Sequence, residues 1–317
     1  MADMPMSRRS ALALAAAVPI GLCAPHRAAA AGPIVRYTMT AFTDTSESDL
    51  YVYESADALN FELLRGPAYR PPTGLLRDPS VFRHVDRAYY LAYTTAWEGQ
   101  TIGFARSTDR RTWNHLYDFT VPIPGVTSTW APEWLIDAQR RVHVLVSLSD
   151  GCSFTPHLMT ATDRSLRSWT DLTPVSILPP PDEPAPVDTP GPDGKPCSLY
   201  GYIDTTVVRR DHRYYAFTKN ETTKYVELAV GAEPHGPYTL IKTGDWTGWG
   251  SPREGQCVVT LPDGGWRIYL DSYDEGKYFY SDCRDDFTTW TEPQELPGLS
   301  GTVRHFTVLP EYGTESG

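Results

Sequence analysis

The feature that most constrains this fold is a polar residue that recurs at the start of an apolar, strand-like segment. Five such segments follow one another at steps of 55, 71, 50 and 51 residues, and they begin at Asp78, Glu133, Asp204, Glu254 and His305. A period near fifty residues with several strands per unit is typical of the blades of a β-propeller. Five units fit the chain, so the repeat predicts a five-bladed β-propeller of the all-β class.

A second repeated pattern marks the far end of each unit, where a polar turn closes on an aromatic residue. These turns run through 55–61, 107–113, 162–169 and 282–290. Second strands are predicted at 88–94, 142–147, 214–219 and 266–272, and third strands at 101–107, 157–162, 225–230 and 277–282. Since Gly and Pro total 24 and 28 residues, short strands separated by turns also suit the composition.

The two ends of the chain each hold part of a unit. Segments 35–43 and 50–55 have strands and a closing turn but no polar start, whereas 302–310 has the start alone. We expect them to share one blade, which would close the ring and remove an exposed sheet edge. The proline-rich stretch 174–196 explains the long step of 71 residues as a surface loop, so residues 32–317 are predicted to form a single catalytic domain.

Residues 1–31 have the pattern of an export signal. Paired arginines, Arg8 and Arg9, precede an apolar run over 11–22 and then four alanines ending at Ala31, an order that also fits the twin-arginine route. The run is too short to span a bilayer, so we expect a secreted protein with no membrane association after cleavage. Four cysteines follow and could form two disulfides in three connectivities; they are Cys152, Cys197, Cys257 and Cys283.

Net charge limits the class of partner. The chain carries 39 acidic and 28 basic side chains, a formal net charge of −11. A surface of this sign argues against nucleic acid and favours a neutral oligosaccharide or polysaccharide side chain as partner. We expect a monomer.

The five polar starts should meet at one place, because the first strand of every blade lines the central channel. Carboxylates crowded at one mouth disfavour joint ionisation, so one can stay protonated as an acid while another acts as a base. That pairing suits glycoside hydrolysis. Each position also has a structural reading: Asp78, Asp204 and Glu254 as turn or strand-end residues, Glu133 as structural, His305 as a satisfied buried histidine. Aromatic residues that could stack on a sugar are Trp97, Trp130, Trp246 and Trp249.

The same residues resemble glycoside hydrolase family 43, the five-bladed propeller enzymes of the arabinofuranosidase and β-xylosidase group. The matching stretches are Arg77-Asp78-Pro79, Trp130-Ala131-Pro132-Glu133, Ile203-Asp204, Arg253-Glu254-Gly255 and Arg304-His305. The resemblance implies Asp78 as general base, Glu254 as general acid and Asp204 as the carboxylate that orients the acid and tunes its pKa. It also implies substrate contacts from Arg77, Trp130, Glu133, Arg253 and His305.

Family 43 inverts the anomeric configuration, which requires base and acid carboxyls ~6.5–9.5 Å apart. No cofactor is required, and the resemblance offers His305 as a ligand of water or of a structural calcium ion in the channel. Phe306 stands where relatives often have glycine.

The sugar itself stays open at this level. We favour an exo-acting α-L-arabinofuranosidase, with an exo-β-D-galactofuranosidase and a β-xylosidase as alternatives. A sialidase-like propeller is a further reading, since 107–113 echoes an Asp-box turn, but Arg110 and Arg111 occupy positions where that turn needs glycine, and the mouth is expected to be acidic. A carbohydrate-binding propeller without catalysis is the non-enzyme reading.

Overall fold

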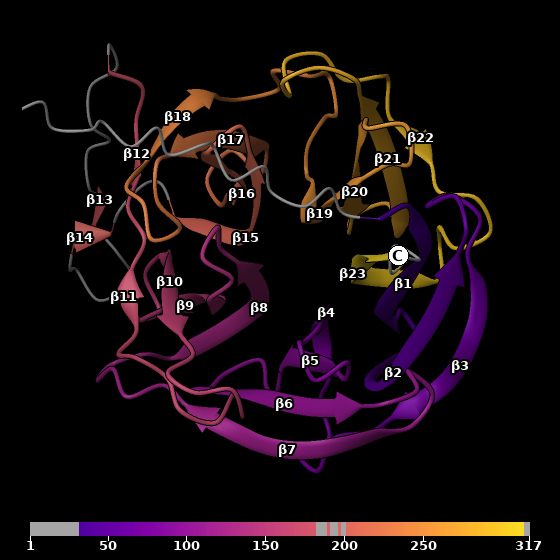
Figure 1. Cartoon of the computed structure of the whole chain (residues 1–317). Coiled ribbons are helices and arrows are strands. Elements are labelled where there is room, and N and C mark those ends of the chain that lie inside the picture. The colour runs from indigo at the N-terminus through magenta and orange to yellow at the C-terminus, as the bar shows by residue number, and fades with distance from the viewer. Residues whose placement is uncertain (1–31, 182–188, 191–195, 198–200, 314–317) are drawn as a thin grey trace, which may run out of the picture. The chain divides into compact units, whose positions relative to one another are not determined.

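Five small, mainly antiparallel sheets stand around a central axis in the computed structural model (Figure 1), and each forms one blade. The structure describes residues 32–181, 189–190, 196–197 and 201–313. The predicted export signal at 1–31 lies outside these residues. All regular elements in the described part are strands, so the predicted all-β propeller is confirmed.

Each blade is named here by its strands from the innermost outwards. Blade 1 is β23 (Val303–Tyr312), β1 (Ile34–Thr43), β2 (Ser46–Ser55) and β3 (Glu62–Tyr69); blade 2 is β4 (Arg77–Arg83), β5 (Tyr89–Thr94), β6 (Thr101–Ser107) and β7 (Trp113–Thr120); blade 3 is β8 (Ser128–Ile136), β9 (Val142–Ser149), β10 (Phe154–Thr160) and β11 (Thr173–Pro174). Blade 4 is β15 (Tyr202–Arg210), β16 (Arg213–Asn220), β17 (Val226–Gly231), β18 (Tyr238–Lys242) and β12 (Ile177–Leu178); blade 5 is β19 (Glu254–Thr260), β20 (Trp266–Ser272), β21 (Lys277–Cys283) and β22 (Gln294–Glu295).

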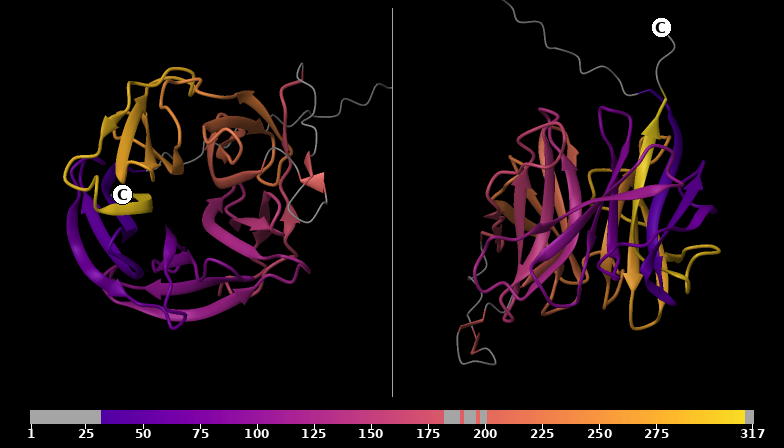
Figure 2. Two further views of the ribbon diagram at one scale, coloured as in Figure 1. Left: turned by 180° about the vertical axis from the view of Figure 1, so that it is seen from behind. Right: turned by 90° about the horizontal axis from the view of Figure 1, so that it is seen from below.

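The ring closes within blade 1. β23, the last described strand, pairs antiparallel with β1, the first described strand, over most of its length. The two ends of the chain therefore share blade 1, in which β23 is the innermost strand. Around the axis, β4 contacts β8, β8 contacts β15, β15 contacts β19, β19 contacts β23, and β23 returns to β4. The predicted sharing of one blade by the two ends is therefore confirmed, and the axial view from behind shows the same closed ring (Figure 2).

The polar turns between third and fourth strands have a shared physical basis. In two of them an aspartate, Asp57 or Asp109, accepts backbone N–H groups from residues two and three positions on, at 2.8–2.9 Å. The closing Trp113 and Trp290 are buried and donate their indole N–H to a backbone carbonyl three residues earlier. The turns thus anchor aromatic side chains between the blades.

Two expectations about the periphery need correction. The proline-rich stretch does not begin as an irregular loop, because β11 ends at Pro174 as the outer strand of blade 3 and β12 pairs in parallel with β18 of blade 4. Further along it, β13 (Thr189–Pro190) pairs with β14 (Pro196–Cys197). The cysteines do not form two disulfides: Cys152 is disulfide-bonded, whereas Cys257 and Cys283 are buried free thiols.

Among the described residues, no helix is long and apolar enough to cross a membrane.

Candidate active site

A β-bulge interrupts every innermost strand at the same height. The pairing register with the neighbouring strand shifts in β4, β8, β15, β19 and β23 alike. At each bulge one residue has a left-handed backbone; these are Asp78 (φ 51°), Ala131 (φ 50°), Asp204 (φ 55°), Gly255 (φ 54°) and His305 (φ 25°). Bulges re-aim side chains and are frequent beside active sites.

The bulges define three layers of equivalent positions along the channel. The outer layer is Arg77, Trp130, Ile203, Glu254 and Arg304; the bulge layer is Asp78, Ala131, Asp204, Gly255 and His305; the inner layer is Ser80, Glu133, Thr206, Cys257 and Thr307. The sequence prediction that all five polar starts occupy one position is therefore wrong for two of them. Glu254 lies one residue before its bulge residue, and Glu133 lies two residues beyond its own.

A pocket of about 460 Å³ opens at the outer layer. It is lined by Glu47, Arg77, Asp78, Thr94, Trp97, Trp130, Ile203, Asp204, Lys219, Glu221, Lys224, Glu254, Tyr273, Arg304 and His305. The three carboxylates that the sequence assigned to catalysis are all among them. The sequence predicted an acidic mouth, and this prediction is wrong. The five carboxyl groups of the lining are balanced by four Arg and Lys side chains and one histidine.

Asp78 is buried against His305. Its Oδ1 lies 3.0 Å from His305 Nδ1, and its Oδ2 accepts a 2.7 Å hydrogen bond from the Thr94 hydroxyl. Burial by itself would raise the pKa of Asp78, but His305, Arg77 and Thr94 together hold it below its usual range. Burial likewise opposes charge on His305, yet Asp78 and Asp204 raise the pKa of His305 to about 10. At neutral pH the pair is a carboxylate beside an imidazolium.

Asp204 is a buried carboxyl with a different balance. Its Oδ2 accepts a 3.1 Å hydrogen bond from the Gly255 N–H and lies 3.9 Å from His305 Nδ1. Burial raises the pKa of Asp204 to about 6, with Glu254 adding to the rise and His305 opposing it. Asp78 and Asp204 thus sit in one pocket with pKa values displaced in opposite directions.

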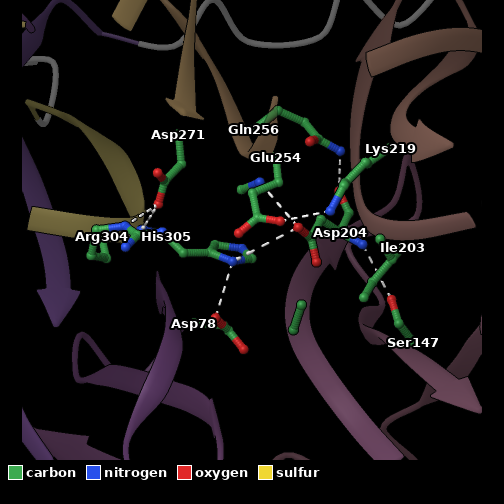
Figure 3. Close-up of polar contacts among 12 residues, drawn as sticks. Asp78, Ser147, Ile203, Asp204, Lys219, Glu254, Gln256, Asp271, Arg304 and His305 are labelled. Carbon is green, nitrogen blue, oxygen red and sulfur yellow. Dashed lines mark hydrogen bonds and ion pairs between the residues drawn. The ribbon is translucent and has the colours of Figure 1, made fainter. Parts of the chain in front are cut away.

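Glu254 reaches the pocket from the outer layer and pairs with Lys219. The Lys219 Nζ lies 2.7 Å from Glu254 Oε2 and 2.7 Å from Glu221 Oε1. In Figure 3 the His305 ring lies between Asp78 on one side and Glu254 on the other, with Asp204 beside Glu254. Asp78 and Glu254 both line the same pocket.

Sequence reasoning missed Lys219, although a usable signal existed. The first and second strands of a blade are antiparallel, so the end of the second strand faces the start of the first. Thr94 pairs with Arg77, Lys219 with Ile203, and Asp271 with Glu254. Polar residues at the ends of the predicted second strands were thus candidates for the same mouth.

Aromatic residues line one side of the pocket. The indole N–H of Trp130 donates to the Trp97 carbonyl at 2.9 Å, and the Arg77 guanidinium lies over the Trp97 ring at 4.0 Å from its centroid. Trp97 remains 49% exposed. Trp246 and Trp249 do not line the pocket but pack in the core of blades 4 and 5.

Two residues predicted to bind substrate lie elsewhere. Arg253 is buried next to the pocket, where its guanidinium donates to the Pro252 carbonyl at 2.8 Å and to the Ser272 hydroxyl at 2.6 Å. Glu133 lies in the inner layer and accepts from Thr206 at 3.3 Å and Thr307 at 3.5 Å. Burial raises the pKa of Glu133 to about 7.

The described channel residues offer few ligands for the calcium ion predicted at His305. The Nδ1 of His305 lies 3.0 Å from Asp78 Oδ1, which leaves Nε2 as the ring nitrogen that could face an ion. Calcium prefers oxygen ligands, and the described residues contain no group of three or more His, Cys, Asp or Glu side chains that could hold a metal.

Neither a protein-family model nor a curated protein sequence matches the chain. Solved structures match its fold. A thermostable family-43 glycoside hydrolase is 14% identical with a TM-score of 0.60, over 83% of this chain and 92% of that one. An endo-1,4-β-xylanase from Bacteroides thetaiotaomicron is also 14% identical, with a TM-score of 0.62 over 84% and 96% of the two chains. An α-L-arabinofuranosidase from Clostridium thermocellum is 11% identical, with a TM-score of 0.55 over 84% and 93%. The chain thus shares the propeller fold of these glycoside hydrolases.

Proposed function

We propose that this protein is a secreted, inverting glycoside hydrolase of the family-43 type that removes terminal furanose residues, with α-L-arabinofuranosides as its first substrate. One observation carries the proposal: Asp78, Asp204 and Glu254, which lie on three different blades, converge in one pocket beside the half-buried His305. A ring of turn residues without a catalytic role would not need two buried carboxyls whose pKa values are displaced in opposite directions.

Asp78 suits the general base. It is ionised at neutral pH, and each of its oxygens keeps a second lone pair beyond the contacts with His305 and Thr94. A water molecule held by Asp78 would attack the anomeric carbon from the face opposite the leaving group. Asp78 would take the proton of that water as the new carbon–oxygen bond forms.

Glu254 suits the general acid. It lines the same pocket as Asp78 and would give its proton to the glycosidic oxygen as the old carbon–oxygen bond breaks. Asp204 lies beside Glu254 as the carboxyl proposed to orient the acid, and the charge of Glu254 adds to the rise that burial causes in the pKa of Asp204. Attack by water from the opposite face inverts the anomeric configuration.

A neutral sugar fits the character of the pocket. Its volume of about 460 Å³ is within the range of small-molecule sites, and the half-exposed Trp97 in its lining is a residue type that stacks on sugars. The arginines are already engaged, since Arg77 pairs with Glu47 and Arg304 with Asp271 at 2.8 Å. They do not form the free cluster that an anionic sialoside would need.

A panel of chromogenic glycosides tests the proposal. The wild-type protein is assayed with an α-L-arabinofuranoside, a β-D-galactofuranoside, a β-D-xyloside and a sialoside, beside Glu254→Gln and Asp78→Asn. We expect turnover of one furanoside, a loss of at least 10²-fold in both variants, and an inverted anomer in the first NMR spectra of the product.

Turnover of the galactofuranoside or xyloside alone would change the sugar while keeping the reaction. Absence of turnover on every substrate, with polysaccharide binding unchanged in the two variants, would refute the catalytic assignment and leave a carbohydrate-binding propeller.

A further inference from the structure

Lys219 is a buried lysine at the centre of the pocket with two carboxylate partners at equal distance. Its side chain is 5% exposed, and its Nζ lies 2.7 Å from both Glu254 Oε2 and Glu221 Oε1. Glu221 is held in turn by Lys224 at 2.6 Å, and the ring of Tyr273 covers the ammonium with its centroid at 5.0 Å. The ammonium is therefore fixed between two acceptors.

The position of the Lys219 ammonium beside Glu254 conflicts with the proposed role of Glu254 as general acid. An ammonium at hydrogen-bond distance favours the ionised form of a carboxyl, whereas a general acid must carry a proton when the glycosidic bond breaks. Burial opposes the charge on Lys219, but Glu254, Asp204 and Glu221 together raise the pKa of Lys219. The lysine thus stays charged, and the conflict is resolved only if its pairing can change.

Glu221 supplies the alternative partner. Once Glu254 Oε2 has taken up a proton from solvent, the ammonium keeps its 2.7 Å ion pair with Glu221, which it shares with Lys224. We propose that Lys219 is a positioning residue, an inference that rests on the proposed function. Lys219 holds Glu254 through Oε2 while Glu254 is ionised, and Glu221 holds Lys219 in place when Glu254 is protonated. The balance between the two carboxylates sets the upper pH limit of activity.

Other charged groups also face Glu254. Asp204 approaches from β15, Asp271 from β20, Tyr273 from the turn after β20, and His305 from β23. Because Glu254 and Asp204 interact, the basic limb of a pH profile reports the pair and not one carboxyl. Lys219 is the group that contacts Glu254 directly, so its removal should produce the largest displacement.

The test is the pH dependence of kcat/KM in wild type, Lys219→Met, Lys219→Arg and Glu221→Gln. Loss of the ammonium in Lys219→Met should move the basic limb up by about one pH unit, since an opposite charge within ~4 Å is removed. Lys219→Arg should restore the limb to within a few tenths of a unit. Glu221→Gln should move it down, because the ammonium then has Glu254 as its main partner.

Lys277→Met serves as the matched control. Lys277 pairs with Glu295 at 3.2 Å on the surface of blade 5, and its removal should leave the profile unchanged. Opposite displacements in Lys219→Met and Glu221→Gln support the proposal, whereas an active wild type with an unmoved limb in both variants overturns it. If Lys219→Met does not fold, the downward shift in Glu221→Gln decides alone. A wild type that hydrolyses no glycoside would instead remove the proposed function.

Discussion

Asp78 and His305 form an opposite-charge pair in the buried part of the pocket, and its contribution to stability depends on pH. The folded-state pKa of His305 is about 10, above the 6.5 of an unfolded histidine. The stabilisation is thus complete below pH 6.5 and is lost as the pH rises through 10. For Asp78 the folded pKa is depressed, so its share is present above the ordinary pKa of aspartate and is lost as the pH falls through the depressed value.

His305→Gln should therefore lower the free energy of unfolding at pH 7 by about 3–5 kcal/mol, because the buried Asp78 carboxylate loses its partner. The difference in unfolding free energy between His305→Gln and wild type should be smaller at pH 10.5, where His305 of the wild type has lost its proton. Urea denaturation at both pH values measures this. If the difference in unfolding free energy is the same at pH 7 and pH 10.5, the Asp78–His305 charge pair does not cause it.

Glu133 should behave in the opposite way, because the folded state favours its neutral form. Its pKa of about 7 exceeds the 4.5 of an unfolded glutamate, so its presence lowers stability as the pH rises from 4.5 through 7. Glu133→Gln should be more stable than wild type by about 3 kcal/mol at pH 8 and by less than about 1 kcal/mol at pH 5. The exposed Glu292→Gln is the control and should show no difference at either pH; a Glu133→Gln variant less stable at pH 8 contradicts the prediction.

At the scale of elements, the site depends on the five bulges of the innermost strands. Gly255 shows why one of them needs glycine: a Cβ at this position would lie 2.8 Å from His305 Cγ, and the backbone φ is +54°. An alanine there must both adopt a strained backbone and displace the imidazole.

Gly255→Ala should lower the melting temperature by more than Gly264→Ala and should reduce kcat/KM at least tenfold. Gly264 provides the comparison because its φ of +85° imposes backbone strain while nothing lies within 4 Å of its Cβ position. Thermal unfolding and glycoside assays on both variants separate strain from displacement of His305. Equal losses in the two variants would contradict the assigned contact.

The same bulges limit what the sequence could predict. Second and third strands were located from their apolar runs, and two of them match at both ends, Thr101–Ser107 and Trp266–Ser272. No outer strand was predicted in any blade. Two of them give little signal, since β22 is two residues long and β3 contains Gly66 and Pro67, but the longer β7 and β18 were missed as well. The alternation of inward and outward side chains along a strand could not place Glu133 and Glu254 in their layers. A bulge adds one residue, and this extra residue reverses which side chains beyond it point into the channel.

At the scale of the whole molecule, every blade depends on its neighbours through the innermost strands. The pocket takes Asp78 from blade 2, Asp204 from blade 4, Glu254 from blade 5 and His305 from blade 1. The repeat could predict this convergence, because a ring places equivalent strand ends at one mouth. It could not predict which pairs would form across the mouth, since the Lys219–Glu254 and Asp78–His305 contacts join residues of different blades.

The closing strand β23 provides the final test of this interdependence. A chain that ends at Gly301 would lack β23, which leaves the edge of β1 unpaired and removes a neighbour of both β4 and β19. We expect this truncated chain to lose its cooperative thermal transition and to aggregate, because an exposed inner edge pairs with other chains. His305→Gln is the control, since it keeps the strand and removes only the imidazole. A soluble truncated monomer with a single sharp transition would show instead that the ring holds together without its closing strand.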